Sequence, residues 1–137
     1  MSAFGKLLLD TDILSLYLKK NPKVVTAAQN YLHDHTVFSF SVITRFEILR
    51  GMKTKNASVQ LNAFDVFCRK NEIIELNDKI IVRASDIYAD LHKTGQIIGD
   101  ADILIAATAL KNNLSIVTNN ENHFNRITQL QIINWNK

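Results

Sequence analysis

The chain has 137 residues, of which 47% are hydrophobic and 21% charged, with a formal net charge of +3. These values fit one globular domain and exclude a disordered chain. The longest apolar stretches stop well short of the ~20 residues of a membrane span, and no secretory signal is visible. A single cysteine, Cys68, excludes an internal disulfide and favours the cytoplasm. The positive charge permits a nucleic-acid partner without requiring one.

Short apolar runs alternate with helical patterns along the whole chain. Helices are expected over residues 13–18, 22–33, 42–52, 59–67, 78–94 and 100–110. Strands are expected over residues 6–9, 36–41, 72–76, 114–118 and 130–135. This alternation predicts an α/β fold with a mostly parallel sheet covered by helices on both faces. No linker or repeat is present, so one domain is expected to span residues 1–137.

Several apolar positions recur at helical spacing and are expected to face the core. The last of these helices is apolar all round and is expected in the centre of the domain. In the other helices, the positions expected to face the core are Val25, Ala28, Leu32, Ile43, Phe46, Ile48, Leu49, Met52, Ile80, Ile81, Ala84, Ile87, Tyr88 and Leu91.

The first strand ends abruptly at two carboxylates, Asp10 and Asp12. The C-terminal tip of a strand in an open parallel sheet is where ligands bind, which favours a functional role. The alternative is that one of these residues only caps the next helix.

Three further acids stand among apolar residues. Glu47 lies one turn into the helix after the second strand, and Asp100 and Asp102 lie in the first turn of the apolar helix. Glu47 has an alternative as an exposed partner of Arg50 or Lys53, and Asp100 has one as a helix cap. Asp102 is harder to explain structurally, because a lone buried carboxylate is costly.

These acids are expected to meet at one edge of the sheet. Two carboxylates ~4 Å apart repel by about 4 kcal/mol at an effective dielectric near 20, so the cluster needs a cation. Oxygen ligands favour Mg²⁺ or Mn²⁺, and the four histidines show no zinc-binding spacing. A cation held by carboxylates suits hydrolysis of a phosphodiester.

Three segments resemble motifs of the PIN-domain ribonucleases, and among them of the VapC-like toxins of bacterial toxin–antitoxin pairs. They are residues 7–15 (LLLDTDILS), 41–51 (SVITRFEILRG) and 98–109 (IGDADILIAATA), the last being the most specific. The resemblance implies that Asp10, Glu47 and Asp102 are catalytic metal ligands, and that Thr11 and Asp12 support them. Asp100 is an added carboxylate, which we expect either to join Asp102 at the site or to replace it.

Residues 116–124 (IVTNNENHF) resemble the last motif of this family, where many members place a fourth acid. Here Asn120 and His123 stand at the candidate positions, with Glu121 between them. The fourth ligand therefore stays open. Thr118 and Asn120 are expected to support the centre, and Asn120 has the alternative of orienting a water or holding the loop after the first strand.

The resemblance covers nearly the whole chain and implies a three-layer α/β fold. It also implies an RNA-cleaving enzyme dependent on Mg²⁺ or Mn²⁺, a homodimer, and a cognate antitoxin with which a larger complex can form. For contact with RNA phosphate, Arg50 is the best candidate, because it lies one turn from Glu47.

Two other functions compete with this interpretation. A phosphatase of the haloacid-dehalogenase type would use Asp10 as nucleophile and Asp12 as acid/base, but it leaves Glu47 unexplained. A non-catalytic PIN fold that binds RNA or protein would follow from the altered last motif. The other acids argue against it.

Overall fold

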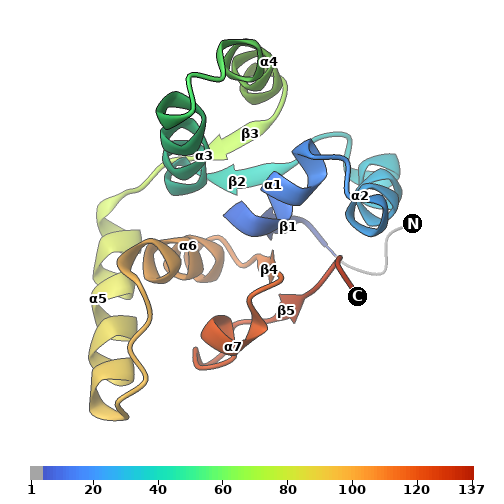
Figure 1. Cartoon of the computed structure of the whole chain (residues 1–137). Helices are drawn as coiled ribbons and strands as arrows, with labels where there is room; N and C mark the ends of the chain where they lie inside the picture. The colour runs from blue at the N-terminus through green and yellow to red at the C-terminus, as the bar shows by residue number, and fades with distance from the viewer. Residues whose placement is uncertain (1–4) are drawn as a thin grey trace.

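The computed structural model describes residues 5–137, and within them helices and strands alternate as expected (Figure 1). No helix in this range is long and apolar enough to cross a membrane. In chain order the elements are β1 (Leu7–Leu9), α1 (Thr11–Leu18), α2 (Pro22–His35), β2 (Ser39–Ser41), α3 (Val42–Thr54), α4 (Ser58–Arg69), β3 (Glu72–Ile74), α5 (Asp78–Lys93), α6 (Asp100–Lys111), β4 (Ser115–Val117), α7 (Glu121–Phe124) and β5 (Ile132–Ile133).

The five strands of the described chain form one parallel sheet in the order β3-β2-β1-β4-β5. Strand β1 is central, and Leu9 lies opposite Phe40 of β2 and Val117 of β4. The chain builds outward from β1 to β2 and β3, then returns to add β4 on the other side. The direction in which strands are added reverses between β1 and β4, so the C-terminal ends of these two strands mark a topological switch point, the usual ligand-binding place in such sheets.

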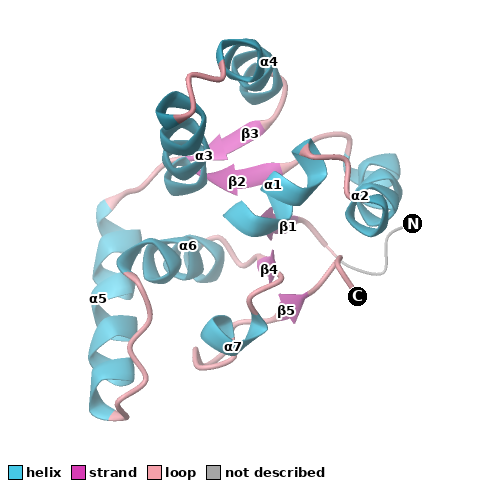
Figure 2. Ribbon diagram, in the orientation of Figure 1, coloured by secondary structure: helices cyan, strands magenta, loops and turns pink. Residues whose placement is uncertain are grey.

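Helices cover both faces of the sheet, so the fold has three layers (Figure 2). Alternate residues of β1 face opposite ways: Leu7 and Leu9 pack with α1, α2 and α4, whereas Leu8 packs with α5 and α6. All three leucines are buried, as a central parallel strand requires. The apolar helix α6 lies in the interior, as its sequence predicts.

Side-chain caps fix where several helices begin. Asn21, Ser41 and Asn77 each accept a hydrogen bond from a backbone N–H of the helix that follows. Pro22 occupies the first turn of α2, and Gly95 ends the α5 region with φ +67°, which glycine adopts without strain. These local signals are readable in the sequence.

Some expectations about the core are wrong. Phe46 is 56% exposed, and Ile81 and Tyr88 are also exposed, because α3 and α5 bury narrower faces than their sequences suggest. Helix α2 buries Val24 and Tyr31 and leaves Val25 and Leu32 only partly covered. The strands are shorter than expected, and α7 was not predicted because four residues carry no periodicity.

Two isoleucines on neighbouring helices allow a matched test of this packing. Ile105 of α6 is fully buried, whereas Ile81 of α5 is 45% exposed. We expect Ile105→Ala to lower the free energy of unfolding by about 2–5 kcal/mol, because it leaves a cavity in the core. Ile81→Ala should change the free energy of unfolding of the monomeric chain by less than about 1 kcal/mol, because Ile81 lies outside the core of the single chain. Urea unfolding followed by circular dichroism measures both, and equal losses would contradict the arrangement of α5 and α6.

Candidate active site

Asp10 lies at the C-terminal tip of β1, beside the switch point. Its backbone N–H donates to Val117 O at 2.9 Å, which extends the β1–β4 pairing to the carboxylate. Its side chain accepts hydrogen bonds from the Thr11 backbone N–H at 2.8 Å and from Thr118 Oγ1 at 2.7 Å. The residue also caps α1, so the structural and functional interpretations of Asp10 are not exclusive.

Asp10 is only 4% exposed. Burial, with the Asp12 carboxylate as the next cause, raises the pKa of Asp10 to about 8, against the two hydrogen bonds that lower it. Asp102 adds a smaller electrostatic contribution in the same direction. A negative charge on Asp10 is therefore costly unless a cation compensates for it.

Asp12 lies beside Asp10 in the first turn of α1. Its Oδ2 accepts from the Asn119 backbone N–H at 3.0 Å, whereas its Oδ1 is buried without a hydrogen-bond partner. Burial is the main cause that raises the pKa of Asp12, and the Asp102 charge adds to it. A buried carboxylate oxygen without a partner normally needs a water or an ion.

Glu47 reaches the same edge from α3. Its Oε1 accepts from Thr11 Oγ1 at 2.7 Å, and Thr11 Oγ1 also lies 2.9 Å from Thr44 Oγ1. Its Oε2 lies 3.7 Å from the Arg50 guanidinium, so part of the ion-pair alternative is observed. Thr44 was not identified from the sequence, although it stands three residues before Glu47 and so shares its helix face.

Asp102 projects from the first turn of α6. Its Oδ2 lies 2.8 Å from His123 Nδ1, and that nitrogen lies 2.8 Å from Asn120 Nδ2. The Asn120 backbone N–H in turn donates to Thr118 Oγ1 at 3.0 Å. The last motif thus contacts the acids from α1 and α6.

Asp100 is placed differently from the other acids. It is exposed at the start of α6, and Gly99 rather than Asp100 occupies the cap position. Within residues 5–137, no hydrogen bond or ion pair joins Asp100 to Asp10, Glu47 or Asp102. The cap alternative is therefore wrong, and a role for Asp100 as ligand stays a prediction.

The donor set suits a hard divalent cation better than zinc. Carboxylate and hydroxyl oxygens dominate it, and Asp12 Oδ1 is a buried oxygen without a partner. In the described range, however, no three His, Cys, Asp or Glu side chains already form a closed metal-binding group. The residues fit a divalent cation by their chemistry.

The sequence of this chain matches the family model of the PIN domain over residues 7–130. The chain belongs to the PIN-domain family. That range contains all the acids described above, so the resemblance inferred from the motifs is confirmed.

The relatives narrow the family further. The chain is 33% identical over 134 residues to Ribonuclease VapC1 of Methanocaldococcus jannaschii, covering 97% of this chain and 89% of the relative. It is 31% identical over 131 residues to Ribonuclease VapC2 of Rickettsia felis, covering 95% and 98%. This PIN domain is therefore VapC-like.

Two solved structures each contain a chain with the same fold as this protein. The VapBC2 complex of Rickettsia felis, bound to a DNA fragment from its promoter, contains a chain that matches with a TM-score of 0.85 at 29% identity, over 96% of this chain and 99% of that one. VapBC-1 of nontypeable Haemophilus influenzae matches with a TM-score of 0.85 at 28% identity, over 97% and 100%. The three-layer fold inferred from the sequence is thus confirmed.

Removing the charge of Asp10 should stabilise this PIN domain when metal is chelated. We expect Asp10→Asn to raise the free energy of unfolding by about 1–3 kcal/mol at pH 8 in EDTA, because the amide needs no counter-charge. The raised pKa of Asp10 makes the native protein lose stability as the pH rises from 3.8 to about 8, so the gain should shrink toward pH 4. Denaturant unfolding at both pH values measures it.

Asp86→Asn on the exposed face of α5 is the matched control and should leave stability unchanged. A destabilised Asp10→Asn protein at pH 8 would contradict the electrostatic picture.

Proposed function

We propose that this chain is a divalent-metal-dependent endoribonuclease and the toxin of a toxin–antitoxin pair. The main support is the geometry at the switch point, where the Thr118 hydroxyl and the Thr11 backbone N–H hold the buried Asp10 carboxylate and the Asp12 and Asp102 charges help to raise its pKa. The relatives named as VapC ribonucleases supply the reaction class. The phosphatase alternative has no comparable support, because it gives Glu47 no role.

In this proposal Asp10, Glu47 and Asp102 hold Mg²⁺ or Mn²⁺, and Asp100 is a further candidate ligand. When bound, the cation would polarise the scissile phosphate and lower the pKa of an attacking water. Thr118 fixes the carboxylate of Asp10, and Thr11 fixes that of Glu47.

One basic side chain beside the acids is placed to bind RNA. Arg50 is exposed and lies beside Glu47, which suits contact with an RNA phosphate next to the scissile one.

The outer face of α5 carries exposed apolar side chains. They belong to Ile81, Val82 and Tyr88, and we assign this face to a homodimer.

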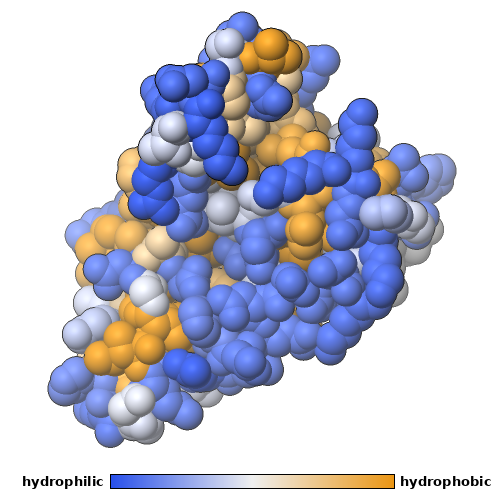
Figure 3. Space-filling view, in the orientation of Figure 1, coloured by the Kyte–Doolittle hydropathy of each residue, from blue (hydrophilic) through white to orange (hydrophobic). Residues whose placement is uncertain are grey.

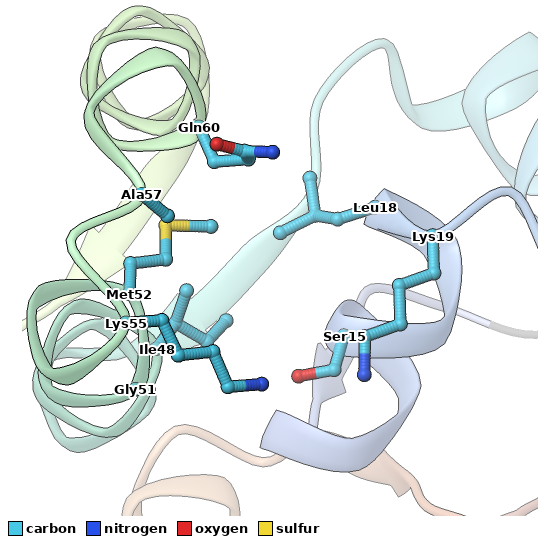
Figure 4. A pocket seen from close by; sticks show the side chains of 9 residues that line it. All are labelled: Ser15, Leu18, Lys19, Ile48, Gly51, Met52, Lys55, Ala57 and Gln60. Atoms are coloured by element: carbon cyan, nitrogen blue, oxygen red, sulfur yellow. The ribbon is translucent and has the colours of Figure 1, made fainter.

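The structure has a groove suited to part of an antitoxin. A cavity of about 380 Å³ lies between α1 and the α3–α4 pair, and Figure 3 shows hydrophobic surface in this hollow. Leu18, Ile48 and Met52 are among its lining residues, and the ammonium groups of Lys19 and Lys55 both point toward Ser15 (Figure 4). Its lining is complementary to an apolar segment carrying an acidic side chain.

We expect the purified chain, free of antitoxin, to cut total cellular RNA into discrete products with Mg²⁺ or Mn²⁺ and not with EDTA. Asp10→Asn and Asp102→Asn should each lower cleavage at least ~100-fold, because each removes a ligand charge at the reacting phosphate. Gel analysis of RNA ends measures this, and Asp86→Asn serves as the control.

Intact RNA under every metal condition, with the protein folded, would favour the binding module. Formation of an aspartyl-phosphate on Asp10 would instead revive the phosphatase.

A charge in the groove should separate antitoxin binding from catalysis. We expect Met52→Lys to prevent co-purification with the co-expressed antitoxin, because it places a third ammonium group beside those of Lys19 and Lys55 on the apolar surface of the groove. RNA cleavage by this variant alone should stay within about threefold of the unsubstituted chain. Retained co-purification would show that the antitoxin uses another surface.

A further inference from the structure

A series of short polar contacts joins two of the acids through the last motif. Thr118 Oγ1 donates to Asp10 Oδ2 at 2.7 Å and accepts from the Asn120 backbone N–H at 3.0 Å. Asn120 Nδ2 lies 2.8 Å from His123 Nδ1, which lies 2.8 Å from Asp102 Oδ2. The segment 118–123 therefore braces Asp10 on β1 and Asp102 on α6 at the same time.

The last contact in this series joins His123 to the Asp102 carboxylate. An imidazole with its proton on Nδ1 donates to the carboxylate of Asp102 in both its neutral and its charged form. With the proton on Nδ1, the Asn120 amide, 2.8 Å away, meets this nitrogen through its oxygen, since a 180° turn of the amide exchanges its oxygen and nitrogen. The contact is partly shielded from water, because the Asp102 side chain is 23% exposed.

We propose that His123 is a positioning residue that holds the Asp102 carboxylate in its metal-binding orientation through Nδ1–H. This inference rests on the metal-dependent function proposed above. It also gives this chain a substitute for the fourth acid of its family: a hydrogen-bond donor stands where another carboxylate would have added negative charge.

The pattern of the contacts favours positioning over direct ligation. His123 Nδ1, the nitrogen nearest the acids, is occupied by Asp102 and Asn120. Groups that hydrogen-bond a metal-binding carboxylate orient it, and their loss typically weakens metal binding ~10–100-fold. A small loop helix, α7, thereby tunes a ligand on the separate helix α6.

The test compares Mn²⁺ affinity in two substitutions of the same residue. In His123→Asn the side-chain amide places an N–H donor close to the position of Nδ1, whereas His123→Ala removes the donor. We expect His123→Ala to weaken Mn²⁺ binding at least ~10-fold in isothermal titration calorimetry and His123→Asn to stay within about threefold of the native affinity. His33→Ala, an exposed histidine of α2, is the control and should not change it.

Unfolding of each variant in EDTA shows whether the fold is intact, and pulsed electron paramagnetic resonance of bound Mn²⁺ reports any nitrogen ligand. Unchanged affinity in His123→Ala would overturn the inference. So would equal weakening in the Asn and Ala variants, or a nitrogen coupling that disappears when His123 is replaced. Failure of the native protein to bind Mn²⁺ would overturn the proposed metal-dependent function as well.

Discussion

The candidate site depends on one buried carboxylate. Asp10 ends the central strand, is 4% exposed and caps α1 while facing the switch point. Thr11 and Thr118 donate to it, yet burial and the nearby Asp12 still raise its pKa to about 8. The fold thus pays a cost at this position that a bound cation would remove.

The parallel sheet explains why the other acids gather there. Strand β1 lies between β2 and β4, so α1, α3 and the last motif all start at the same edge. The Thr11 hydroxyl donates to Glu47, and His123 Nδ1 contacts the Asp102 carboxylate. Each of these acids therefore has a short polar support, and residues far apart in sequence lie at one edge of the sheet because the topology brings strand ends together.

Local patterns predicted most of the fold. The caps at Asn21 and Asn77, the alternation of strands and helices, and the apolar helix α6 were readable because each reflects short-range chemistry. The exposure of Phe46 was not, since which part of an apolar face finds a partner depends on the packing of other helices. For the site, the sequence singled out the acids, but it could not show that Asp100 stands apart or that His123 touches Asp102, because both depend on tertiary geometry.

The central claim is that these acids form one cation-binding centre. Crystals of the antitoxin-free chain soaked in Mn²⁺ and measured at the manganese absorption edge test it most directly. The account predicts an anomalous peak within bonding distance, about 2.1–2.3 Å, of carboxylate oxygens of Asp10 and Asp102. No peak at this edge of the sheet, at Mn²⁺ concentrations that support RNA cleavage, would contradict it.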